Sequence, residues 1–210
     1  MREAEERTLL ISKDEVRIKT EEGKRPILRI KVAPYNTPSV GLRFTEYTQP
    51  GCFTEWLDSE QDILSCFNHQ RHYILGRRCK GTARFIDTPE ALWLEVDIPN
   101  TSYGQDLIEN VENGNVDGAS FRFRCHEGGD RWSNGYSRRD LFKCELLEAG
   151  PVVDPVYEET DVTVAMRSLE AARKGEENPH DKDESNEPDE DSSVRHNELK
   201  WRALELAELA

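Results

Sequence analysis

The chain has 210 residues, of which 36% are hydrophobic and 33% are charged, and its formal net charge is −14 at pH 7. This length fits one domain, or one domain with a tail, and the low hydrophobic content indicates that part of the chain buries little surface. The negative charge argues against direct binding to nucleic acid or anionic lipid, and no apolar run approaches the roughly 20 residues that span a bilayer, so we expect a soluble intracellular protein.

The first part of the chain predicts a charged arm followed by a β-rich region. Residues 1–25 are dense in charge and are expected to form a poorly ordered N-terminal arm. Beyond Pro26, apolar runs and alternating patterns replace the charge. They predict strands over 27–33 and 62–69, a hairpin whose strands are 80–86 and 91–98, and a short helix over 50–59.

The next part predicts one clear helix and three more strands. Ser102 is placed to cap a helix that ends at Gly114, and Gln105 follows three residues later, as in a capping box. Strands are expected over 116–125, 136–149 and 162–166. Together these elements predict an α+β, β-rich domain over residues 26–169, with few helices at its edges.

The C-terminal part changes composition. Residues 170–194 are dominated by Glu, Asp, Ser, Asn and Pro, and such a segment buries too little apolar surface to fold, so we expect an acidic disordered linker. Helical spacing returns over 195–210, which predicts a short amphipathic helix. That helix is too short to be stable alone, so it either docks on a partner or frays.

Two residues on separate predicted strands have the chemistry of a nucleophilic hydrolase. Ser120 alternates with Phe121 and Phe123, so it lies on the face opposite the core side chains. His69 stands at the end of the run 62–69, where an imidazole can act as a general base. Either residue alone is more often an ordinary strand serine or a semi-buried histidine.

The third member of such a triad has two candidates. Glu148 shares its parity with Leu146 on the apolar face, where a carboxylate needs a partner such as an imidazole. Glu145 has the opposite parity and can simply be solvated, so Glu148 is preferred while Glu145 remains the alternative. A Cys–His pair built from Cys66 and His69 is disfavoured, because the two side chains point to opposite faces of one predicted strand.

No cofactor or metal site is predicted. The sequence lacks H-x-x-x-H, C-x-x-C and D-x-D-x-D patterns and a Gly-rich phosphate loop. Its five cysteines are scattered and odd in number, which favours reduced thiols in an intracellular protein.

Several short blocks, taken in this order and spacing, resemble the tailed-bacteriophage prohead (procapsid) maturation protease family. The blocks are Pro50–Phe53, Phe67–His69 followed by Leu75–Arg77, Leu92–Thr101, Tyr103–Leu107, Gly114–Phe121, Glu145–Val152 and Pro155–Tyr157. The resemblance covers about residues 27–168. The chain departs from the family at Ala119, where methionine is frequent, and at Gln70-Arg71, where Asp-Pro is common.

The resemblance implies a fold related to the herpesvirus maturation protease, a mostly antiparallel seven-stranded barrel flanked by helices. It also implies a serine endopeptidase with His69 as base, Ser120 as nucleophile and Glu148 as the best match to the acidic third member. No cofactor is implied.

The implied role is cleavage of scaffold or of the scaffold-like segment of the capsid protein, or of both, together with cleavage of the protease itself. The expected partners are the major capsid protein, the scaffold and possible further copies of this chain, inside the assembling procapsid in the bacterial host cytoplasm. The alternative from another class is a catalytically silent β-barrel that binds scaffold or capsid protein during assembly.

Overall fold

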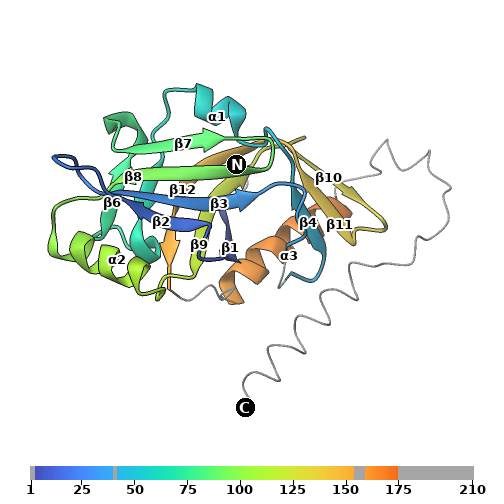
Figure 1. The fold of residues 1–210 in the computed structure, drawn as a ribbon. Coiled ribbons are helices and arrows are strands. Elements are labelled where there is room, and N and C mark those ends of the chain that lie inside the picture. Colours follow the sequence, from blue (N-terminus) through green and yellow to red (C-terminus); the bar gives the residue numbers. More distant parts are fainter. Residues whose placement is uncertain (1–2, 40–41, 154–158, 175–210) are drawn as a thin grey trace, which may run out of the picture. The chain divides into compact units, whose positions relative to one another are not determined.

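The computed structural model describes residues 3–39, 42–153 and 159–174, which lie in one compact unit that ends at Lys174 (Figure 1). These residues form three β-sheets, three α-helices and two single 3₁₀ turns. The predicted β-rich α+β class is therefore confirmed. No helix in the described ranges has the length and apolar character needed to cross a membrane.

The largest sheet has five strands in the order β1-β9-β12-β5-β6. Its strands are β1 Glu5–Leu10, β9 Gly118–Cys125, β12 Cys144–Val152, β5 Leu64–Cys66 and β6 Ile74–Arg77. Neighbouring strands run antiparallel except β12 and β5, which run parallel and share one register pair, Glu148 with Leu64. Figure 1 shows β9 and β12 running beside each other through the middle of the domain.

Two smaller sheets complete the β-structure. The four-stranded sheet has the order β2-β3-β8-β7, with β2 Val16–Lys19, β3 Ile27–Pro34, β8 Ala91–Asp97 and β7 Ala83–Asp87. The three-stranded sheet has the order β10-β11-β4, with β10 Asp130–Ser133, β11 Arg138–Leu141 and β4 Thr45–Thr48. The predicted hairpin over 80–98 is present as β7 and β8.

The expected single seven-stranded barrel is not confirmed. Each of the three sheets begins and ends on different strands, so within the described ranges no sheet closes on itself. Register shifts also interrupt the pairing within two of the sheets. One register shift lies in β12 between Leu146 and Glu148, and β3 carries another between Lys31 and Ala33 where it pairs with β8.

The helices are short except at the end of the unit. They are α1 Thr54–Asp58, α2 Ser102–Glu112 and α3 Glu159–Lys174, with 3₁₀ turns η1 Phe67–His69 and η2 Arg78–Lys80. The predicted helix at Ser102 is present, but its cap differs from the prediction. Thr101 is the N-cap, and its side chain accepts a hydrogen bond from the Gly104 backbone N–H at 3.2 Å.

The structure corrects two expectations at the ends of the domain. Residues 1–25 were expected to be poorly ordered, yet they contain β1 and β2, because the charges of β1 find buried partners elsewhere in the chain. The strand expected over 162–166 is part of α3, in which Ala165, Leu169 and Ala172 recur at helical spacing and pack on one cluster. Helix α3 also passes the expected boundary at residue 169.

The acidic linker expected over 170–194 and the terminal helix expected over 195–210 lie outside the described residues beyond Lys174. Both therefore stay predictions.

The core lies between the five-stranded and four-stranded sheets. The side chains of Leu28, Leu94, Phe123 and Leu146 have at most 2% of their surface exposed there. A smaller cluster joins Phe44, Trp132, Ala165 and Leu169 near the three-stranded sheet.

A network of buried charges fixes β1 against the three-stranded sheet. Arg139 of β11 is fully buried, and its guanidinium contacts Glu5 at 2.7 Å, Glu46 at 3.0 Å and Asp130 at 2.9 Å. Arg7 of β1 completes the network, with Nε 2.6 Å from Glu46 and Nη2 2.7 Å from Glu5. Burial opposes ionisation of Glu5, but Arg139 and Arg7 outweigh it and lower its pKa to about 2.

Removal of Arg139 tests this network. Arg139→Met would leave three buried carboxylates with Arg7 as the remaining cation, and we expect it to reduce the free energy of unfolding by about 3–5 kcal/mol. The neighbouring Arg138 gives a matched control, because its side chain is 42% exposed and its partner Asp140 keeps a second hydrogen bond, from Gln49 Nε2 at 2.8 Å. Arg138→Met should cost about 1 kcal/mol or less. Urea unfolding of both variants measures the difference, and equal midpoints would contradict a structural role for the network.

Candidate active site

The three predicted site residues come from three neighbouring parts of the five-stranded sheet. Ser120 lies on β9, Glu148 on the adjacent β12, and His69 in the turn η1 that directly follows β5. Because β12 lies between β9 and β5 in the sheet, the strand order brings the three positions to one region. The structure joins His69 to Glu148 directly, whereas Nε2 of His69 makes no hydrogen bond with Ser120.

Ser120 is fully buried in the middle of the sheet, with β1 on one side and β12 on the other. It pairs with Thr8 across β1 and with Gly150 across β12. Ala119 and Phe121, the neighbours of Ser120 in β9, are buried in the main core, so Ser120 faces away from the core as the alternation predicts.

Gly150 brings the histidine-bearing turn close to Ser120. A Cβ atom at position 150 would stand only 2.1 Å from the backbone oxygen of Cys66, the last residue of β5. Only glycine allows this approach, since no real Cβ contact is so short. The glycine opposite the serine therefore sets how closely β5, and with it η1, packs against β12.

His69 is not on a strand, contrary to the prediction of a strand over 62–69. Strand β5 ends at Cys66, and Asn68 and His69 have left-handed backbone angles of φ 49° and φ 55°. Non-glycine residues rarely adopt such angles, so the surrounding contacts must hold the turn. One such contact is the Asn68 side-chain oxygen, which accepts a hydrogen bond from the backbone N–H of Val153 at 3.0 Å.

A β-bulge turns Glu148 toward Ser120. The register of β12 against β9 shifts between Leu146 and Glu148, so Leu146 pairs with Phe123 on the core face while Glu148 pairs with Arg122 on the face of Ser120. The parity argument had placed Glu148 on the apolar face with Leu146. The preferred residue does approach His69, but the reason given for preferring it was wrong, because the extra residue Leu147 reverses the parity.

Glu148 and Glu145 have different partners. Glu148 is 3% exposed, and its Oε1 is 3.0 Å from His69 Nδ1. The Glu145 carboxylate instead binds Arg124 Nη1 at 2.5 Å and lies 3.6 Å from His126 Nε2. The geometry thus connects Glu148, and not Glu145, with the candidate base.

The alternative nucleophile Cys66 is held in its unreactive form. Its burial and the adjacent Glu148 carboxylate raise the pKa of the Cys66 thiol to about 11. The thiolate is the nucleophilic form of cysteine, so a pKa this high keeps Cys66 protonated and inert at neutral pH.

A fourth residue, Glu6 of β1, was missed by the sequence reasoning. Its Oε1 is 3.0 Å from His69 Nε2 and 3.4 Å from Ser120 Oγ, and its Oε2 is 3.4 Å from Arg122 Nε. The alternation of Glu6 and Thr8 within the charged N-terminal segment is the signal that could have identified it. The charge of that segment predicts an unstructured arm, and the partners of Glu6 are more than 60 residues away in sequence.

The hydroxyl of Ser120 is engaged by β1. It accepts a hydrogen bond from Thr8 Oγ1 at 3.2 Å, and the Arg7 carbonyl oxygen lies within hydrogen-bond reach at 3.1 Å. Nε2 of His69 has no well-directed hydrogen bond to any described residue, and Glu6 Oε1 is close to it but off the N–H direction. The arrangement holds the candidate nucleophile Ser120 and the candidate base His69 apart, with the Glu6 carboxylate between them.

The electrostatics favour a protonated His69. Burial favours the neutral imidazole, but the contacts with Glu148 and Glu6 outweigh it and raise the pKa of His69 to about 9. Arg122 of β9 lies next to the Glu6 carboxylate, and the Cys66 thiol of β5 lies next to the Glu148 carboxylate. His69 is therefore an imidazolium at neutral pH, paired with carboxylates on both ring nitrogens.

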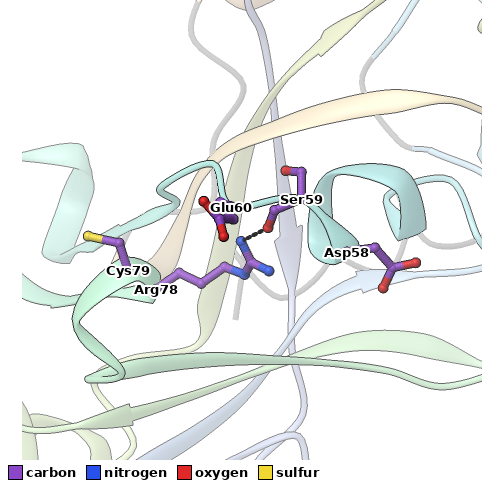
Figure 2. A pocket seen from close by; sticks show the side chains of 5 residues that line it. All are labelled: Asp58, Ser59, Glu60, Arg78 and Cys79. Carbon is purple, nitrogen blue, oxygen red and sulfur yellow. Dashed lines mark hydrogen bonds between the residues drawn. The ribbon is translucent and has the colours of Figure 1, made fainter.

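A separate hollow of about 550 Å³ lies elsewhere on the unit and is lined by Asp58, Ser59, Glu60, Arg78 and Cys79 (Figure 2). The Arg78 guanidinium is already bound there to the backbone oxygens of Ser59 and Gln61, at 2.5 and 2.8 Å. None of the candidate site residues lines this hollow. Across the described ranges, no three His, Cys, Asp or Glu side chains are grouped to hold a metal ion.

Comparison with known proteins identifies a family for this chain. The family model described as caudovirus prohead serine protease matches residues 13–175. Searches of the curated proteins and of the solved structures gave no match.

The pKa of His69 tests the paired geometry. Its folded value of about 9 exceeds the ordinary value of 6.5, so the contacts of His69 stabilise the fold fully below pH 6.5, and this contribution is lost as the pH rises through 9. We expect NMR titration of the His69 ring protons, assigned by their loss in His69→Ala, to show this high pKa. Glu148→Gln should lower it. A wild-type value near 6.5 would contradict the geometry.

Proposed function

Since the chain belongs to the caudovirus prohead serine protease family, we propose that it is a serine endopeptidase of phage procapsid maturation in which Ser120 is the nucleophile. His69 is the general base and Glu148 the residue that orients it. The observation that carries this assignment is the 3.0 Å contact between His69 Nδ1 and Glu148 Oε1. With Nδ1 bound to Glu148, the other ring nitrogen, Nε2, is left for Ser120, which shares a face of the sheet with Glu148.

The proposed reaction follows from these roles. Once Nε2 is neutral and in contact with Ser120, the serine oxygen attacks the scissile carbonyl carbon while its proton passes to Nε2. The tetrahedral intermediate collapses by breaking the C–N bond, and the leaving amine takes that proton. A water molecule then gives a proton to the same nitrogen and attacks the carbonyl carbon of the acyl ester. As the ester C–O bond breaks, Nε2 passes that proton to the oxygen of Ser120. Glu148 stabilises the imidazolium that forms in each half of the reaction.

The proposed substrates are the scaffold, the scaffold-like segment of the major capsid protein, and the protease itself. Membership of the family supports an association with the procapsid inside the bacterial host, while the individual cleaved proteins are part of the proposal. A relation in fold to the herpesvirus maturation protease also stays a prediction.

The second candidate function is a catalytically silent module that binds scaffold or capsid protein. The observation that favours it is that the Glu6 carboxylate separates Ser120 from His69. In a silent protein this separation would be permanent. The presence of all three triad groups on one face favours the protease.

Loss of the nucleophile or base tests the protease directly. Ser120→Ala and His69→Ala should each reduce cleavage of co-expressed capsid and scaffold proteins by at least about 10⁴-fold, and the double variant should be barely worse, because triad members act as a unit. Ser133→Ala, on β10 of another sheet, is the matched control and should cleave like the wild type. Gel analysis of the capsid protein measures the cleavage, and activity retained in Ser120→Ala would refute the assignment.

The two glutamates of β12 separate orientation from simple charge. Glu148→Gln should slow cleavage by about 10³-fold, less than Ser120→Ala, because an orienting residue is less essential than the nucleophile. Glu145→Gln removes the same charge from the same strand and should leave the rate within a few-fold of wild type. If the two variants behave the other way round, Glu145 is the third member.

A further inference from the structure

Strand β1 occupies the edge of the strand that carries the proposed nucleophile. β1 is the end strand of its sheet and pairs with β9 from Glu5 opposite Phe123 to Leu10 opposite Gly118. Ser120 has no exposed surface with β1 in this position. No substrate carbonyl carbon can therefore reach its oxygen until β1 moves.

The chain itself supplies a peptide bond next to the nucleophile. The Arg7 carbonyl oxygen is 3.1 Å from Ser120 Oγ, which is a hydrogen-bonding contact to the oxygen and not an approach to the carbon. An extended peptide that pairs antiparallel with a free strand edge is a common way for a protein to bind a peptide. β1 thus has the position and direction that an extended substrate would take along β9.

Glu6 distinguishes this occupant from a substrate. Its carboxylate stands between His69 Nε2, at 3.0 Å, and Ser120 Oγ, at 3.4 Å, where a working base and nucleophile would meet each other. A substrate strand without a carboxylate at this place would leave the two catalytic groups free to make contact.

We propose that the β9 edge beside Ser120 is the binding site for an extended substrate segment, and that β1 fills this site in the resting protein with Glu6 as the blocking group. The inference rests on the proposed function and adds how its site is regulated. Departure of β1 opens the edge to substrate and brings His69 within reach of Ser120.

The charges around the site agree with this switch. With β1 in place, Glu6 and Glu148 balance Arg122 and a protonated His69. When Glu6 leaves, Glu148 and Arg122 balance each other only if His69 gives up its proton. Removal of the blocking carboxylate therefore also favours the neutral imidazole that a general base requires.

The buried network of Glu5, Arg7, Glu46, Asp130 and Arg139 keeps the same net charge when β1 departs. β1 contributes one acid, Glu5, and one base, Arg7, to that network. What remains is Arg139 with Glu46 and Asp130, whose contacts at 3.0 and 2.9 Å do not involve β1. The family match begins at residue 13, so residues 5–10 lie outside the part of the chain that it covers.

Reaction with a peptidyl phosphonate tests the blocking role of Glu6, because the reagent forms a covalent adduct with an activated serine. At pH 7.5 we expect Glu6→Ala and Glu6→Gln to react at least about tenfold faster than wild type. Without the blocking carboxylate, a larger fraction of the molecules has Ser120 in contact with His69 and able to react. Both should also bring the pKa of His69 below its value of about 9. Glu3→Gln is the matched control, since Glu3 makes an exposed pair with Arg167.

A reversible cross-link tests the movement of β1 separately from the charge of Glu6. The 2.8 Å bond from the Ile11 N–H to the Asp117 oxygen marks a hydrogen-bonded pair, so Leu10 and Gly118 form a non-hydrogen-bonded pair with close side-chain positions. In a protein carrying Leu10→Cys and Gly118→Cys, the disulfide should suppress phosphonate labelling at least about tenfold, and reduction of the same sample should restore it.

The outcomes separate this inference from the proposed function. Equal rates in wild type and both Glu6 variants, or slower reaction of the variants, would overturn the blocking role while leaving the protease intact. Equal labelling of the oxidised and reduced cross-linked protein would overturn the movement of β1. If no form is labelled and Ser120→Ala cleaves capsid protein like wild type, the proposed function itself fails.

Discussion

The pairing of β9 with β12, interrupted by the bulge at Leu147, is the constraint on which the candidate site depends. A regular ladder would send Glu148 into the core beside Leu146, where an unpaired carboxylate costs several kcal/mol. The bulge instead places this acid on the face of Ser120 and within 3.0 Å of His69. Gly150, opposite Ser120, then lets the backbone of β5 approach closely enough to present the turn that carries the histidine.

Charge pairing in the interior explains why the N-terminal segment is ordered. Glu5 and Arg7 would read as a solvated run on an acidic chain, yet they are 2% and 4% exposed and meet Glu46 and Arg139. The alternate side chains of the same strand, Glu6 and Thr8, face Ser120. One face of β1 therefore anchors the strand, and the other face contacts the proposed catalytic groups. The same strand thus accounts for the stability of the resting form and for the proposed block of its site.

Local patterns predicted the β-rich class, the hairpin of β7 and β8, helix α2 and the outward face of Ser120, because each depends on alternation or helical spacing within a few residues. Features set by distant contacts were not predictable in this way. The left-handed turn at His69 depends on Asn68 binding the backbone after β12, and the order of β1 depends on partners in β4 and β11. The choice of Glu148 agreed with the geometry through a parity argument that the bulge reverses.

The central claim is that Ser120 becomes nucleophilic through His69 and Glu148 on a shared face of the sheet. The most direct measurement is the mapping, by peptide mass spectrometry, of the adduct left by a peptidyl phosphonate on the wild-type protein. The account predicts one adduct, on Ser120, that is absent from His69→Ala. An adduct on another residue would contradict the account. Loss of capsid-protein cleavage after treatment with a phosphonate that leaves Ser120 unmodified would contradict it as well.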